Sequence, residues 1–292
     1  VIPTDTINIH IDKDALLRSG IMLPKTIRHL KGEDLKDAIP DKLYIPLTDI
    51  RMLTKVDLLM LEMLANCNWE RPLYLAISVG SVSKLKFDNY FVQEGLAFRF
   101  TPFDYKKWGD VGENRLYAVD VERLYDNVMN RYKYGGLDTP GLYLDETTLR
   151  TCWYHRRLFA QLAKELIAQG DNERAKKVLA YAEQVIPGYN VPETHESGSY
   201  DIATAYAALG EKTKAVTLAV HLIAEAEDYI NWAFSLKGNR IEMVRNDCIY
   251  KFWQWNQYNE LLKKIDGEKY KESNRRFEEK YALFAPTMNY KN

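Results

Sequence analysis

The sequence predicts an α+β domain with a small mixed sheet over residues 1–141, followed by an all-α domain of helical repeats over residues 142–292. Near the N-terminus, apolar and polar residues alternate with the two-residue period of half-buried strands. In the second half, apolar and small residues recur at helical spacing. Gly135-Gly136 and Pro140-Gly141 break the chain between these two patterns, so we place the domain boundary there.

One stretch after the boundary orders its residue types as aromatic, Leu-small, large, Gly, small, large, small and Pro. The residues are Phe159, Leu162-Ala163, Leu166, Gly170, Ala175, Leu179, Ala182 and Pro187. These are the spacings of a tetratricopeptide unit. We therefore expect helix A over about residues 156–168 and helix B over about residues 172–185. The helices should pack antiparallel, with Ala163, Ala175 and Ala182 where the two backbones approach.

The same order returns about 40 residues later, and the added length lies in the loop over residues 188–196. The matching residues are Ile202-Ala203, Tyr206, Gly210, Ala215, Ala219 and Leu222. Asp145 is a suitable N-cap for a long helix over residues 146–169, so the first repeat helix should begin in the linker. A last helix over about residues 267–284 has one apolar face and should close the end of the array.

Aromatic residues concentrate late in the chain. They are Tyr229, Trp232, Phe234, Tyr250, Phe252, Trp253, Trp255 and Tyr258. We favour the interpretation that they form the core and cap of a degenerate third helical pair. A stacking surface for sugar rings or for a peptide is the alternative.

In the first domain, residues 6–12 alternate as a half-buried strand and residues 42–46 form a second strand. Residues 55–66 have the apolar spacing of an amphipathic helix. Pro72 then starts a β-prone run over residues 73–79, which predicts a buried strand. We expect a short helix or turn at 88–95, a strand at 96–103 and a helix at 119–132.

Composition excludes several classes of function. With a formal net charge of -1, the chain shows no sign of the basic face that nucleic-acid binding needs, so we predict no nucleic-acid partner.

The apolar stretch 56–67 is too short for a bilayer, so we expect no transmembrane helix here. The three cysteines are widely spaced and should be free thiols. The chain begins Val1-Ile2-Pro3 without Met, which predicts a piece of a longer protein.

Patterns typical of catalysis are missing: there is no GxSxG, no HExxH and no Cys-His signature, so we predict no catalytic residue, cofactor or metal.

Three segments resemble binding sites weakly: His10 with Asp12 and Asp14, the carboxylates and histidine of 193–201, and the Gly-Ser turn 80–84. Exposed polar faces and loops explain the first two better. The turn lacks the spacing of a phosphate-binding loop.

Four motifs stand in a distinctive order: Asn68-Trp69-Glu70-Arg71-Pro72-Leu73-Tyr74, Asp88-Asn89-Tyr90-Phe91, Glu94-Gly95-Leu96-Ala97-Phe98-Arg99 and Tyr143-Leu144-Asp145-Glu146. Over residues 1 to about 225, the chain resembles the C-terminal soluble part of a family of large multi-spanning bacterial membrane proteins. Their membrane part is similar to GT-C protein O-mannosyltransferases. The resemblance implies a periplasmic domain at the inner membrane, attached through a membrane part that is absent here. Because a GT-C catalytic site lies in the membrane part, no catalytic residue transfers to this chain.

The family motifs also define a candidate binding site. Its residues are Trp69, Glu70, Arg71, Tyr90, Glu94 and Arg99. We expect Arg71 to have a structural role and to pair with a carboxylate or with backbone carbonyls, with Glu94 as the first candidate partner.

Three functions follow from these patterns. The first is a non-catalytic domain that binds or positions an acceptor polypeptide or partner protein beside a glycosyltransferase-like membrane domain, with glycan contact left open. The second is a carbohydrate-active or hydrolytic α+β module braced by helical repeats. The third is a periplasmic assembly scaffold. A pocket lined by the six candidate residues favours the second function, and a shallow groove in the repeats favours the other two.

Overall fold

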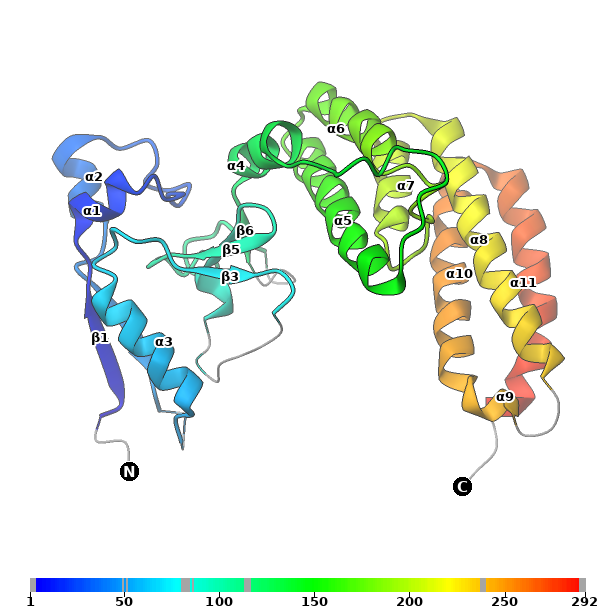
Figure 1. Ribbon diagram of the computed structural model, residues 1–292, viewed down its shortest axis with the longest axis horizontal. Coiled ribbons are helices and arrows are strands. Elements are labelled where there is room, and N and C mark those ends of the chain that lie inside the picture. Colours follow the sequence, from blue (N-terminus) through cyan, green and yellow to red (C-terminus); the bar gives the residue numbers. More distant parts are fainter. Residues whose placement is uncertain are drawn as a thin grey trace. The chain divides into compact units, whose positions relative to one another are not determined.

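The structure is a computed structural model and describes residues 4–48, 50, 52–79, 85, 87–112, 117–236 and 240–288. The contacts within the chain form two compact units, Val1–Arg131 and Tyr132–Asn292. The first unit combines small sheets with helices, and the second is helical, as the sequence predicts (Figure 1).

The first unit begins with a two-stranded antiparallel sheet. Strand β1 (Thr6–His10) pairs with β2 (Lys42–Pro46), so that Ile9 lies opposite Leu43. Ile9, Leu43 and Ile45 are buried, while the residues between them on β2 are exposed. The alternation in the sequence therefore corresponds to one face on the core and one face in water.

A second sheet has four short strands in the order β3-β5-β4-β6. They are β3 (Tyr74–Ala76), β5 (Ala97–Phe100), β4 (Phe91–Gln93) and β6 (Ala118–Val119). Strands β4 and β6 run parallel, and the other neighbours run antiparallel.

The prediction of a buried strand over residues 73–79 is wrong in its length and in its burial. Strand β3 has three residues, and both Tyr74 and Ala76 are exposed. It lies at the edge of the sheet, where only one side has a partner strand. The chain then turns, since the Val79 amide donates to the Ala76 carbonyl (3.0 Å). The Gly-Ser turn 80–84 lies outside the described residues.

Short helices surround these strands. They are α1 (Lys13–Arg18), α2 (Gly32–Ala38), α3 (Lys55–Asn66), the 3₁₀ turn η1 (Asp88–Tyr90), α4 (Val121–Asp126) and the π-helical turn η2 (Asn127–Arg131). Helix α3 has the predicted bounds. It starts with a capping box, in which the Thr54 hydroxyl accepts from the Asp57 amide and the Asp57 carboxylate accepts from the Thr54 amide.

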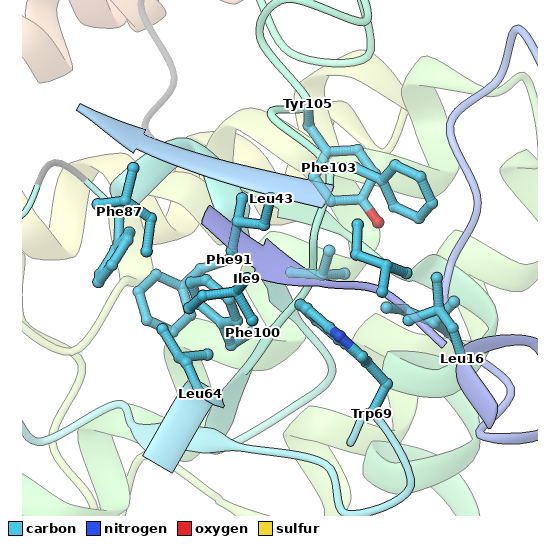
Figure 2. Packing of buried hydrophobic residues seen from close by; sticks show 14 of the residues in the cluster. Ile9, Leu16, Leu43, Leu64, Trp69, Phe87, Phe91, Phe100, Phe103 and Tyr105 are labelled. Atoms are coloured by element: carbon cyan, nitrogen blue, oxygen red, sulfur yellow. The ribbon is translucent and has the colours of Figure 1, made fainter. Parts of the chain in front are cut away.

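An apolar cluster from both sheets and α3 forms the core of this unit. Figure 2 shows side chains of β1 and β2, such as Ile9 and Leu43, meeting the rings of Phe91 and Phe100. Trp69 belongs to this core: its ring centroid lies 6.4 Å from that of Phe100, and its indole Nε1 donates to the His10 carbonyl (2.8 Å). The indole thus connects the end of α3 to the end of β1.

The second unit consists of α5 (Glu146–Ala168), α6 (Asn172–Val185), α7 (Ser199–Ala208), α8 (Lys212–Ser235), α9 (Arg240–Met243), α10 (Arg245–Ile265) and α11 (Gly267–Met288). Asp145 caps α5 as predicted, because its carboxylate accepts from the amides of Thr147 and Thr148. Helix α6 has the predicted bounds. Helices α5 and α6, α7 and α8, and α10 and α11 contact each other pairwise (Figure 1).

The positions expected to face the helix contacts are buried in both segments. In the first they are Phe159, Leu162, Ala163, Leu166, Ala175, Leu179 and Ala182, and in the second Ile202, Ala203, Tyr206, Ala215, Ala219 and Leu222. Both first helices end at a glycine in the left-handed region, Gly170 at φ 79° and Gly210 at φ 78°. A residue with a Cβ is strained at such positions, so glycine permits the tight turn.

The boundary between the units lies ten residues before the predicted one, after Arg131. The intervening segment packs on the helices of the second unit. The Tyr134 ring lies 5.6 Å from Phe159 and 6.0 Å from Tyr181, measured between centroids. The Asn190 side chain donates to the carbonyls of Leu137 and Thr139. The glycines of this segment mark a bend and do not mark the boundary.

The late aromatic residues divide between core and surface. Phe252, Trp255 and Tyr258 of α10 are buried, as the core interpretation predicts. Tyr250 and Trp253 on the same helix are about half exposed, with 45% and 48% of their surface accessible.

Candidate functional site

The six candidate residues of the first unit occupy different environments. Trp69 lies in the core, Glu94 and Arg99 are buried, Tyr90 is half-buried, and Glu70 and Arg71 are exposed. Trp69, Arg71 and Arg99 border a cavity of about 10 Å³, which holds at most about one water molecule. Tyr90 borders a different cavity of about 280 Å³ beside β2. The structure therefore does not gather the six residues around one pocket.

Glu94 and Arg99 do meet, in a buried ionic cluster. The Glu94 carboxylate accepts a hydrogen bond from the Tyr74 hydroxyl (2.8 Å) and lies 3.2 Å from Arg123 Nη1 and 3.6 Å from Arg99 Nη1. Arg99 Nη2 also donates to the carbonyl and hydroxyl oxygens of Ser19. Burial and the hydrogen bond to Glu94 both raise the pKa of Tyr74. This cluster joins β3, β5, α4 and the end of α1.

The predicted pairing of Arg71 with Glu94 is wrong. Strand register explains why: Arg99 lies opposite Tyr74 on one side and opposite Val92 on the other, which brings it next to Glu94. Arg123 completes the pair from α4. Within the described part of the chain, the exposed Arg71 guanidinium has no ion pair.

A cavity of about 450 Å³ lies in the second unit, between α5, α6, α7, α8 and the loop that follows α6. This volume is in the range of about 300–1,000 Å³ that is typical of ligand sites. Its floor is apolar and comes from Leu179, Ala182, Ile186, Ile202 and Leu218, all buried.

The rim of this cavity is polar. Thr213, Thr217 and His221 stand one helical turn apart on α8, and all three are exposed. On the facing side, the Glu183 carboxylate accepts from Lys214 Nζ (2.8 Å) and from the Tyr206 hydroxyl (2.5 Å). Burial is the main cause that raises the pKa of Tyr206, so this hydroxyl stays protonated and donates. The cavity thus combines an apolar floor with hydrogen-bonding groups at its edge.

One buried arginine shapes the loop that borders the cavity. Arg156 of α5 donates to the carbonyls of Ile186 (3.0 Å) and Pro192 (2.8 Å) and to the Ser197 hydroxyl (3.2 Å). It also donates to the Val191 carbonyl (2.5 Å). Burial lowers the pKa of Arg156 to about 10, so the side chain remains charged at neutral pH. The loop is therefore wrapped around a single cation.

Sequence reasoning missed Arg156 and Lys214 in the second unit, and Tyr74 and Arg123 in the first. The sequence pattern does indicate that Arg156 is buried. It shares a helix face with Cys152, Phe159 and Ala163, and a charged residue among buried positions needs several partners. No comparable signal exists for Arg123, whose spacing on α4 is that of an ordinary surface residue.

The described residues contain no group of three or more His, Cys, Asp or Glu side chains placed to hold a metal ion. In the same part of the chain, no helix combines the length and apolar character needed to cross a bilayer. Asp12 and Asp14, considered above as ligands, have other partners: Asp12 caps α1, and Asp14 pairs with Lys36 at 2.8 Å.

The fold and these sites define a protein of two units, an α+β unit with a buried ionic cluster and a helical unit with an open cavity. Residues 1–122 match the family model of TMEM260-associated domain 2. The matched region lies within the first unit and contains all six candidate residues, while the cavity of the helical unit lies beyond it. Searches of curated proteins and of solved structures found no match to the chain.

Proposed function

We propose that this chain is the non-catalytic extracytoplasmic domain of a glycosyltransferase-like membrane protein, and that it binds or positions an acceptor polypeptide or partner protein. The cavity of the helical unit carries the proposal. Its rim runs from Thr213 to His221 of α8, and these two residues are eight steps apart, which corresponds to about 12 Å at 1.5 Å per residue. An extended peptide rises about 3.3 Å per residue, so about four residues fit along the rim.

The chemistry of the cavity suits a peptide. Leu179, Ile202 and Leu218 offer an apolar surface for one side chain of the ligand. Thr213 and Thr217 can each donate and accept a hydrogen bond, as the alternating amide and carbonyl groups of an extended backbone require. Open grooves between helix pairs are the usual binding surfaces of helical repeat proteins.

Two further observations support the tetratricopeptide-like and membrane-associated parts of the proposal. The helix pairs α5–α6 and α7–α8 share buried positions and a left-handed glycine turn, as expected for two related units. The match of residues 1–122 to TMEM260-associated domain 2 is consistent with the resemblance to the soluble region of a multi-spanning membrane protein.

A photo-crosslinking amino acid at Thr213, in the full-length protein in intact cells, tests the binding role. We expect crosslinks to a polypeptide, and we expect Thr217→Trp to remove them because the indole fills the cavity from an exposed position. The same crosslinker at Lys271, exposed on α11, is the matched control. Equal capture from Lys271, or capture that Thr217→Trp leaves unchanged, contradicts the proposal.

The proposed periplasmic location has a separate test. Protease added to intact spheroplasts should digest this domain, whereas a cytosolic marker protein should stay intact. Protection of the domain until the spheroplasts are lysed contradicts the periplasmic assignment without affecting the proposed peptide site.

A further inference from the structure

Two exposed aromatic rings of α10 form a patch on the helical unit. The ring centroids of Tyr250 and Trp253 lie 5.5 Å apart, and their planes are 12° from parallel. Most aromatic residues of α10 are buried, so these two leave apolar surface in water that the fold does not need for its core. Exposed aromatic residues of this kind are enriched where proteins bind partners.

The loop residue His195 holds these rings in place. Its ring lies 6.1 Å from Tyr250 and 5.5 Å from Trp253, edge-on to both, and it stacks on Tyr200 at 5.7 Å. Its Nδ1 makes a 2.9 Å hydrogen bond with the buried Tyr258 hydroxyl. The patch is therefore preorganised, and a ligand loses little free energy in ordering it.

The surroundings of the patch are acidic. Burial lowers the pKa of His195, and the carboxylates of Glu196 and Asp201 act in the opposite direction, so both lie within electrostatic reach of the ring. Glu260 acts in the same way on Tyr200. The nearby cation Lys251 is already paired with Glu225 at 3.0 Å. The charge available to a ligand here is therefore negative.

Gln254 supplies an independent observation. Its side chain is completely buried, and its Nε2 donates to Glu196 Oε1 at 2.9 Å. In the described part of the chain, no donor reaches its Oε1. The hydrogen bond from Gln254 holds the Glu196 carboxylate beside the patch.

We propose that Tyr250, Trp253 and Tyr200, together with Glu196 and Asp201, form a binding site for an arginine side chain of a polypeptide partner. A guanidinium is flat and stacks on aromatic faces, and its five N–H donors suit the carboxylate acceptors of Glu196 and Asp201. Acidic surroundings favour this cation over a neutral ligand such as a sugar ring. The site uses none of the residues that line the cavity described above, so it can exist whether or not that cavity binds a peptide.

The test follows by NMR the indole N–H signals of the six tryptophans in the full chain labelled with ¹⁵N-tryptophan. The signal of Trp253 is the one missing from the Trp253→Leu variant. The probe is the capped peptide Gly-Gly-Arg-Gly-Gly, and its matched control carries citrulline, which has nearly the same shape and no charge. We expect the arginine peptide to shift the Trp253 signal and to bind about tenfold more tightly than the citrulline peptide, a factor equal to about 1.4 kcal/mol.

Variants of the protein show whether the arginine peptide binds at the proposed site. Trp232 on α8 is 49% exposed, close to the 48% of Trp253, so Trp232→Leu is the matched control and should bind the arginine peptide as the unchanged chain does. Asp201→Asn, at an exposed position, should weaken arginine binding and leave citrulline binding unchanged.

Equal affinity for the arginine and citrulline peptides, or a response centred on Trp232, overturns the proposal. A shift of the Trp253 signal by a methyl pyranoside, without one by the arginine peptide, also overturns it and makes the patch a sugar-binding surface.

Discussion

Glu94 and Arg123 form an ion pair of 3.2 Å between the hairpin of β4 and β5 and helix α4. The Glu94 side chain is almost inaccessible to water, with 7% of its surface exposed, and a second arginine, Arg99, is buried beside it. The cluster has a structural role, because each of its charged groups contacts a residue of at least one other secondary-structure element.

Glu94→Gln should destabilise the first unit by about 3–5 kcal/mol, since it leaves the buried Arg99 without its counter-charge. Glu70→Gln is the matched control, because Glu70 is exposed and lies 3.9 Å from an exposed Arg18. Its effect should be within about 0.5 kcal/mol. Urea unfolding curves of the two variants measure the difference. Equal midpoints for both variants contradict a structural role of the cluster.

Ala175→Leu should lower the stability of the helical unit by about 1–3 kcal/mol. Ala175 is completely buried between α6 and its neighbours, and a larger side chain forces the helices apart. Lys176→Leu, on the exposed face of the same helix, should have little effect. Thermal unfolding of the two variants tests the register proposed from the sequence. Greater sensitivity at Lys176 means that the register is shifted by one residue.

Stability should fall in mild acid partly because of His155. Burial lowers its pKa in the folded chain below the ordinary value of 6.5. As pH falls through about 6.5, the unfolded chain binds a proton more readily at this residue, so the folded state is disfavoured. His155→Phe keeps an aromatic ring against Tyr132 and Tyr134. The thermal midpoint of this variant should drop less between pH 7.5 and pH 5 than that of the unchanged chain. An equal drop in both rules out a contribution from His155.

A fragment of residues 132–292 should be more stable than one of residues 142–292. The longer fragment keeps Tyr134 against Phe159 and Tyr181, and it keeps the two carbonyls that Asn190 needs. We expect both fragments to be helical by circular dichroism and the shorter one to melt several degrees lower. Identical melting curves indicate that residues 132–141 add no stability to the helical unit.

The elements that could be predicted from the sequence are those with a strong local pattern. Strand β2 and helices α3 and α6 have the expected bounds, because alternation, caps and helical spacing act over a few residues. Pairings between distant residues could not be predicted in this way. Glu94 meets Arg99 and Arg123 through strand register and the position of α4, neither of which a local pattern contains.

The cavity was beyond sequence reasoning for a similar reason. Its lining comes from four helices and a loop, between Arg156 and His221, and each residue has an ordinary local context. The family motifs drew attention to the first unit, where they mark core and structural positions as well as surface ones. Trp69 is an example, since its indole hydrogen bond to His10 explains the residue without a ligand.

Arg156 gives the two proposed binding surfaces a common support. The loop that it holds contributes Ile186 and Glu193 to the cavity, and His195 and Glu196 to the aromatic patch. A peptide that binds in the cavity can restrict the motion of this loop. The loop then has less conformational entropy to lose when arginine binds at the patch. Thermodynamic linkage requires the effect to be equal in both directions. Arg156, which lines the cavity and holds the loop of the patch, would then couple the two proposed surfaces for a partner that engages both.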